Sequence, residues 1–162
     1  MGSSRLMFML QPDAPVRAAL EQMLVSTGLG AQLGESLFAP GNWHQSLSER
    51  IYDPSPAQIE ALLAVGAAVQ APGSSLCLDR IDSALDAKGR IQVALRGPAH
   101  NKTSLMPVLT ALRAQLHAAG FGALATGITA HTTLSYNAPR LLPRLRLAQP
   151  VWWAYDELRL VL

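Results

Sequence analysis

The pattern His-x-[Ser/Thr]-Leu occurs twice in this chain of 162 residues, as His44-Gln45-Ser46-Leu47 and as His131-Thr132-Thr133-Leu134. In an extended strand, side chains at positions i and i+2 point to the same face. Each copy therefore puts an imidazole and a hydroxyl on one face and a leucine on the other, where the leucine can join a core. The repeat predicts two strands that bring two histidines and two hydroxyls to one bound group.

The rest of the chain predicts strands and helices around these two segments. Asp13 is a suitable N-cap for a first helix, and residues 86–89 read as the turn of a hairpin. Apolar spacing and turn residues then predict a strand at 5–10, a first histidine strand at 42–51, a helix at 57–69, hairpin strands at 75–85 and 90–95, a helix at 104–119, a second histidine strand at 128–136, a Pro/Arg loop at 138–150 and a closing segment at 151–162. This order is typical of an α+β fold with antiparallel sheets.

Composition limits the class of protein. The chain is long enough for one domain, with 49% hydrophobic and 15% charged residues, and no apolar run approaches the length of a membrane span. The single Cys77 lies in an apolar run and suits a reducing compartment, so we expect a cytoplasmic protein. No protein partner is indicated, and we expect a monomer. The net charge of +2 requires that any phosphate-rich ligand be held locally.

The paired motif carries the chemistry that the sequence offers. One imidazole can take a proton while the other gives one, which suits attack on a phosphate ester, with His44 and His131 as catalytic residues. Ser46 and Thr133 would present their hydroxyls to the same bound group. The chain has no cluster of carboxylates and histidines at metal-binding spacing, so the site requires no metal and no cofactor. Taken singly, each histidine would more often be a structural strand residue with satisfied hydrogen bonds; the duplication favours catalysis.

Other side chains near the motifs are weaker candidates for substrate binding. Arg50 continues the period of two and could grip a phosphate, or could be a solvated strand end. Trp43 and Tyr136 could stack on a base, or could pack in the interior. A basic loop at 138–150 is either solvated or in contact with an RNA backbone, through Arg140, Arg144 and Arg146.

With its two motifs in this order, the chain resembles the two-histidine (2H) phosphoesterase superfamily, and within it the LigT-like branch of bacterial 2′-5′ RNA ligases and RNA 2′,3′-cyclic phosphodiesterases. The likeness spans nearly the whole chain: the opening Arg5-Leu6-Met7-Phe8-Met9-Leu10-Gln11-Pro12, the entry Gly41-Asn42-Trp43-His44, the segment from 89 to 97 with the helix after it, and the ending from 152 to 162. At the middle position of the motif, where the family usually has an apolar residue, this chain has Gln45 and Thr132.

The resemblance implies a single two-lobed domain over residues 1–162, with two antiparallel sheets, helices on the outside and pseudo-two-fold halves around a central cleft. It implies metal-independent hydrolysis of a 2′,3′-cyclic phosphate at an RNA or nucleotide end, with His131 as base and His44 as acid, and a reverse 2′-5′ ligation. Two alternatives stay open: a non-catalytic module that binds RNA or nucleotides in the same cleft, and a phosphodiesterase for another small cyclic phosphodiester.

Overall fold

A computed structural model describes residues 2–162. Its helices and strands follow one another in the order expected of an α+β fold. They are β1 (Arg5–Leu10), α1 (Ala14–Ser26), α2 (Leu29–Leu33), β2 (Gln45–Ser46), β3 (Ile51–Tyr52), α3 (Pro56–Ala68), β4 (Ser74–Leu85), β5 (Ile91–Arg96), α4 (His100–Ala118), β6 (Thr132–Ser135), β7 (Leu145–Tyr155) and β8 (Arg159–Val161), with short 3₁₀ turns at Gly34–Ser36, Pro40–Asn42 and Gly122–Leu124.

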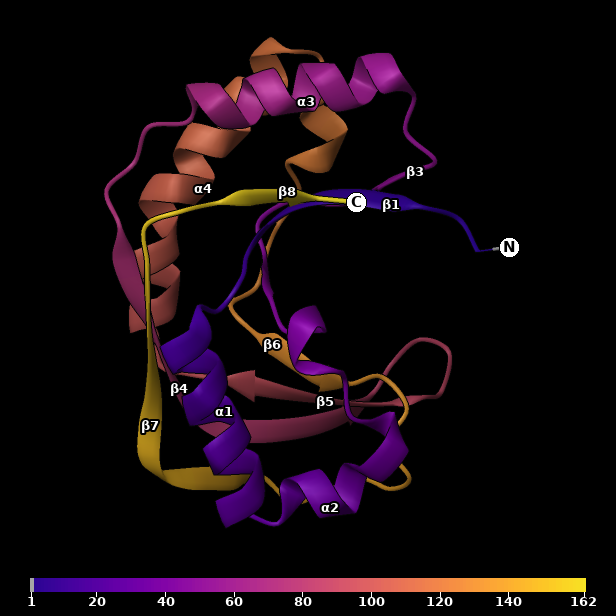
Figure 1. Ribbon diagram of the computed structural model, residues 1–162, viewed down its shortest axis with the longest axis vertical. Coiled ribbons are helices and arrows are strands. Elements are labelled where there is room, and N and C mark those ends of the chain that lie inside the picture. The colour runs from indigo at the N-terminus through magenta and orange to yellow at the C-terminus, as the bar shows by residue number, and fades with distance from the viewer. Residues whose placement is uncertain (1) are drawn as a thin grey trace.

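Two four-stranded antiparallel sheets form the framework. In the first, β1 pairs with β8 and with both β2 and β3, and in the second the order is β6-β5-β4-β7. The two motif strands, β2 and β6, each lie at the edge of their sheet. Figure 1 shows the first sheet beside α3 and α4, and the second sheet beside α1 and α2, which gives the two lobes that the sequence predicts. The long strands β4 and β7 run between the lobes (Figure 1).

Local sequence signals explain several element boundaries. Asp13 caps α1 through the backbone N–H of Val16, and Ser55 and Gln58 form a capping box at the start of α3. The predicted hairpin is confirmed, and its turn requires a positive φ of 74° at Gly89. Within residues 2–162, no helix is both long and apolar enough to cross a membrane.

The first histidine strand is shorter than predicted, because the backbone leaves the ladder between β2 and β3. Ser48 is buried, and its hydroxyl accepts a hydrogen bond from the backbone N–H of Phe8 and donates one to the Glu49 carbonyl. The side chain thus replaces the backbone group that a regular strand would offer to β1. As a result, Ser46 pairs with Met9 and Ile51 with Leu6, so the motif side carries two more residues than β1 over this stretch.

Two other predicted boundaries were wrong. The loop expected at 138–150 ends earlier, because β7 begins at Leu145; Pro150 is tolerated in this strand because it lies in an irregular stretch where the pairing with β4 is interrupted. Helix α4 begins at His100, four residues before the predicted start. The reason is Asn101, whose buried amide donates to the carbonyl of Cys77 and accepts from its N–H, so that the first turn of α4 closes the edge of β4.

Candidate active site

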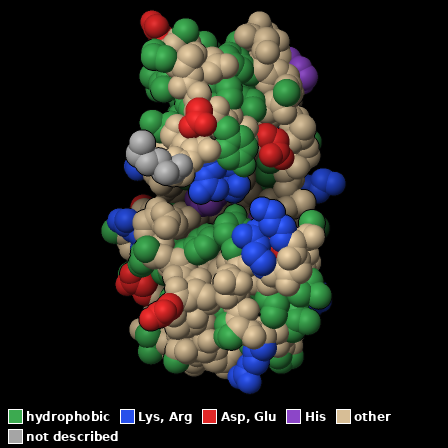
Figure 2. Space-filling model, turned by 90° about the vertical axis from the view of Figure 1, so that its right-hand side faces the viewer, with side chains coloured by type: hydrophobic (Ala, Val, Ile, Leu, Met, Phe, Trp, Pro, Cys, Tyr) green, Lys and Arg blue, Asp and Glu red, His purple; other side chains and the backbone are tan. Residues whose placement is uncertain are grey.

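A polar cleft of about 250 Å³ lies between the two motif strands. The chain segments that form it are β1, the stretch from His44 to Arg50, and the stretch from Gly127 to Tyr136. Both histidines and both motif hydroxyls line it, together with Met7, Ser48, Glu49, Arg50, Ile128, Thr129 and Tyr136. In the space-filling view of this side, a histidine shows at the bottom of a hollow between groups of basic side chains (Figure 2).

Each histidine ring is held through its Nδ1 atom by the residue two positions earlier. In the first motif, Nδ1 of His44 lies 2.8 Å from the carbonyl oxygen of Asn42. In the second, Nδ1 of His131 lies 2.8 Å from Oγ1 of Thr129 and 3.2 Å from the Thr129 carbonyl oxygen. A carbonyl only accepts, so these bonds favour a proton on Nδ1 and leave Nε2 of each neutral ring as a lone pair. The two Nε2 atoms are therefore the ones available for proton transfer.

Burial lowers the pKa of both histidines below the usual value of 6.5. For His44, the Arg50 charge adds to this effect, against the hydrogen bond to Asn42 that favours the charged ring. For His131, Arg96 and then His44 lower the pKa further, against the hydrogen bond to Thr129. Both groups therefore titrate on the acidic side of an ordinary histidine.

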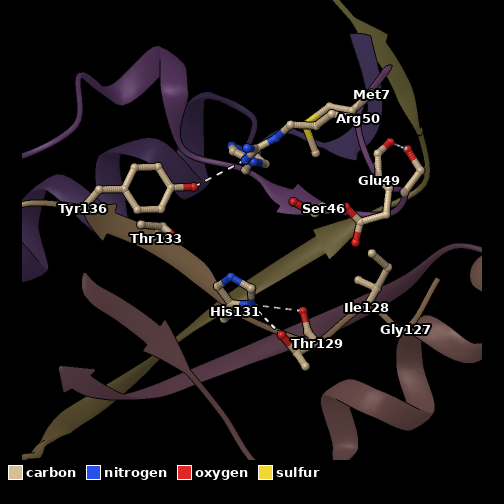
Figure 3. A pocket seen from close by; sticks show the side chains of 12 residues that line it. Met7, Ser46, Glu49, Arg50, Gly127, Ile128, Thr129, His131, Thr133 and Tyr136 are labelled. Atoms are coloured by element: carbon tan, nitrogen blue, oxygen red, sulfur yellow. Dashed lines mark hydrogen bonds between the residues drawn. The ribbon is translucent and has the colours of Figure 1, made fainter. Parts of the chain in front are cut away.

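The two motif hydroxyls face the cleft from opposite sides (Figure 3). Oγ1 of Thr133 accepts a hydrogen bond of 3.1 Å from the side-chain amide of Gln92 on β5. Since that lone pair is engaged, the threonine is left to donate its own proton to a ligand. Leu47 and Leu134, the last residues of the two motifs, are buried in the core as the alternation predicts. Sequence reasoning missed Gln92, because only the strand pairing puts it beside Thr133.

A β-bulge decides which aromatic side chain enters the cleft. Val93 pairs with Ser135 and Ala94 with Thr133, so Leu134 is the extra residue on β6. The alternation shifts by one after it. Tyr136 therefore lines the cleft, whereas Ser135, which unbroken alternation from His131 and Thr133 would put on the cleft face, is fully buried outside it. The Tyr136 hydroxyl accepts a hydrogen bond of 3.5 Å from Arg50 (Figure 3).

Trp43, predicted as a stacking residue, does not reach the cleft. Its side chain is 1% exposed and belongs to the hydrophobic core. The reason is the strand alternation itself: with His44 and Ser46 on the cleft face, Trp43 and Leu47 must point the other way. The prediction for Trp43 was wrong, whereas Arg50 and Tyr136 do line the cleft.

The basic segment after Tyr136 is placed differently from the predicted loop. Arg144 is bound to Asp82, at 2.7 Å between Nε and Oδ1, and Arg146 lies within β7. Neither residue lines the cleft, and Arg140 also lies outside it. In the part of the chain that the structure describes, no three His, Cys, Asp or Glu side chains come together as a metal site.

Gln45, the middle residue of the first motif, links the two motifs directly. Its side chain is 1% exposed, and its Oε1 accepts a hydrogen bond of 2.9 Å from the backbone N–H of His131. Its Nε2 donates to the carbonyl oxygens of Ser46 and Thr129, at 2.9 and 3.0 Å. The Thr129 carbonyl is also within reach of the His131 ring. The amide thus holds the backbone that carries one histidine against the strand that carries the other. A buried glutamine at a usually apolar position was the available signal.

Replacing Gln45 with methionine should therefore impair turnover more than binding. The variant keeps the approximate size of the side chain but removes the acceptor of the His131 backbone N–H and one donor to the Thr129 carbonyl. Loss of a hydrogen-bond partner of this kind costs about 1–3 kcal/mol of stability. We expect kcat on a cyclic phosphodiester to fall by about 10- to 100-fold with KM changed by less than about threefold, because the ring of His131 is displaced. Steady-state kinetics and thermal melting measure both effects. The exposed Gln32→Met on α2 is the matched control; equal kcat in the two variants would contradict a positioning role for Gln45.

The fold of this chain is similar to that of known phosphoesterases. No family model and no curated protein matches the sequence. Among solved structures, E. coli LigT without ligand superposes with a TM-score of 0.71 at 20% identity, covering 99% of this chain and 87% of that one. E. coli LigT complexed with 3′-AMP gives a TM-score of 0.72 at 22% identity, with 98% and 87% covered. A protein described as a phosphoesterase gives 0.71 at 21% identity, with 96% and 86% covered. The chain therefore has the LigT fold over nearly its full length.

Proposed function

We propose that this chain is a two-histidine phosphoesterase that hydrolyses a 2′,3′-cyclic phosphodiester at the end of an RNA or nucleotide, without a metal ion. One observation supports this most strongly: two imidazoles with matching Nδ1 contacts line one small cleft with two hydroxyls. The LigT fold is consistent with it, and the 3′-AMP complex of E. coli LigT supports a nucleotide as the ligand.

The reaction uses both Nε2 atoms. Neutral His131 takes a proton from water as the water oxygen attacks phosphorus, and the bond from phosphorus to one ribose oxygen breaks. Charged His44 protonates that oxygen, so the products are a phosphomonoester and a free ribose hydroxyl. Ser46 and Thr133 donate to the non-bridging oxygens, where negative charge accumulates. With the 5′-hydroxyl of a second RNA in place of water, attack on the same phosphorus breaks its bond to the 3′ ribose oxygen, which His44 protonates, and a 2′-5′ linkage forms.

Arg50 and Tyr136 complete the proposed phosphate site. Burial alone would lower the pKa of Arg50, but its contacts with Tyr136 and Tyr52 outweigh burial and raise it. The guanidinium therefore stays charged and can pair with the phosphate from the side of the cleft opposite His131 (Figure 3).

A substrate panel in excess EDTA tests the proposed reaction. The panel holds nucleoside 2′,3′-cyclic phosphates, a 3′,5′-cyclic nucleotide, ADP-ribose 1″,2″-cyclic phosphate and a linear phosphodiester. We expect turnover of the 2′,3′-cyclic compounds, unchanged by exhaustive chelation, because proton transfer and charge stabilisation come from side chains. Turnover lost in EDTA and restored by a divalent ion would refute the mechanism. Preference for another cyclic compound would move the assignment to that substrate.

The pH dependence of kcat/KM should be bell-shaped with its maximum below pH 6.5. Both limbs arise from the paired histidines, and burial lowers the pKa of each. Arg50→Met removes a positive charge that lowers the pKa of His44, so the limb due to His44 should move to higher pH. If His44 is the acid, that limb is the alkaline one. Movement of the acidic limb would make His44 the base, and a plateau through alkaline pH would leave only one titrating base.

A further inference from the structure

Three arginines form a line across the second sheet that starts beside His131. Arg96 on β5 is paired with Arg80 on β4, and Arg80 is paired with Arg146 on β7. Residues directly opposite each other on neighbouring strands point to the same face of a sheet. We call these three residues the arginine row. Leu95 of β5 pairs with Thr132, so the next residue, Arg96, lies beside His131 at the start of the second motif, and its charge lowers the pKa of that ring.

The row lies on the cleft face of the sheet. One step along the strands, Ala94 of β5 pairs with Thr133, which lines the cleft, and with Asp82 of β4. Arg96 is two residues beyond Ala94 and therefore shares its face. In Figure 1, the same sheet runs from β6 through β5 and β4 to β7. With strands about 4.8 Å apart, Arg146 lies about 14 Å from His131.

The charges of the row are poorly neutralised within the protein. Like charges directly opposite on neighbouring strands destabilise a sheet. In the adjacent position on this face, Arg144 has a carboxylate partner in Asp82 at 2.7 Å. In the row, by contrast, the described part of the chain supplies one close carboxylate, Asp79, at 3.4 Å from Arg80. Nε of Arg80 is buried and has no hydrogen-bond partner among residues 2–162. An external anion at the accessible guanidinium ends of the row would offset these like charges, whereas the buried Nε of Arg80 lies out of its reach.

We propose that the arginine row binds the phosphodiester backbone of a single-stranded RNA whose 3′ end occupies the cleft. This rests on the proposed function, because a 2′,3′-cyclic phosphate is terminal and the rest of such a strand must leave the cleft through the 5′ oxygen. A single phosphate needs one or two guanidinium groups, whereas a line of three at strand spacing matches a chain of repeated phosphates. A stretch of about 14 Å holds up to about four stacked nucleotides at 3.4 Å each. The preferred substrate is therefore an oligonucleotide end, not a mononucleotide.

The first test is binding, which needs no turnover. Fluorescence anisotropy follows a 5′-labelled hexauridylate with a 3′-phosphate, titrated at several salt concentrations with wild type and with Arg80→Gln/Arg146→Gln. Each phosphate contact to a single strand contributes about 0.7 to the slope of log K against log salt. We expect the double variant to lose about 1.4 from the slope and at least about tenfold in affinity at low salt. The control, Arg17→Gln/Arg113→Gln on α1 and α4, makes the same change in net charge and should match wild type.

Equal slopes in the double variant and the control would overturn the proposal, as would equal affinities of wild type for hexauridylate and 3′-UMP. A hexaglutamate peptide that displaces the RNA equally well would assign the row to an acidic protein instead. A second test compares kcat/KM on a 2′,3′-cyclic mononucleotide and on the hexamer with a cyclic end. The double variant should lose at least about tenfold more on the hexamer. If wild type hydrolyses neither the cyclic mononucleotide nor the hexamer, the proposed function fails. The salt dependence of RNA binding then still shows whether the arginine row binds RNA.

Discussion

Alanine in place of either cleft histidine is expected to lower kcat/KM for a 2′,3′-cyclic nucleotide by about 10²- to 10⁴-fold, the range for loss of one general acid or base. Both rings lie in the same cleft with Nε2 free for proton transfer, so we expect kcat/KM to fall in His44→Ala and in His131→Ala alike. Folding should change little, because each ring is only half-buried. Release of the phosphomonoester, measured by chromatography, gives the rates.

His117→Ala is the matched control, since His117 is exposed on α4 outside the cleft. The same variants separate catalysis from simple binding. A catalytic pair predicts that His44→Ala and His131→Ala still bind a product nucleotide while turnover collapses. If wild type binds nucleotides but neither histidine variant differs from it in any rate, the chain is a binding module.

Removing the motif hydroxyls should have the second-largest effect. Thr133→Val and Ser46→Ala each delete one donor aimed at the developing charge on phosphate, and we expect kcat to fall by about 10²- to 10³-fold in each. The Thr133 hydroxyl accepts from Gln92, so its own proton is the one that a ligand would receive. Steady-state kinetics on the cyclic nucleotide measures the loss.

Thr132→Val is the control for this pair. Thr132 is the neighbouring residue, fully buried on the opposite face, and its hydroxyl has no hydrogen-bond partner among the described residues. Valine has the same shape and removes an unpaired polar group, so the control should be as stable as wild type or more stable. A loss of kcat in Thr132→Val as large as that in Thr133→Val would mean that the valine substitution disturbs packing and that the donor assignment is unfounded.

The parts of the fold that follow from local alternation and helix signals could be predicted from the sequence. The period of two in each motif correctly puts the imidazole and hydroxyl on one face and the leucine in the core. Asp13 marks the start of α1, and the turn at 86–89 marks the hairpin. The same alternation also excludes Trp43 from the cleft, and it would have ruled out base stacking by Trp43 from the sequence alone.

The features that could not be predicted depend on contacts between distant segments. Ser48 interrupts the first motif strand only because Phe8 lies beside it, and the bulge at Leu134 brings Tyr136 into the cleft only through pairing with β5. The link from Gln45 to His131 and the arginine row likewise need the relative placement of strands. The sequence shows which residues are available for such contacts, but it does not show which residues of distant strands are paired with one another.

The most direct test of the central claim, that the two histidines act as one acid–base pair, is the double variant His44→Ala/His131→Ala. Residues that act in one step are not additive, so removing the second should cost little once the first is gone. We expect the hydrolysis rate of a 2′,3′-cyclic nucleotide in EDTA, followed by ³¹P NMR, to be within about tenfold of the slower single variant. A double variant whose loss equals the product of the two single losses would mean that the histidines contribute independently, and would contradict the paired mechanism.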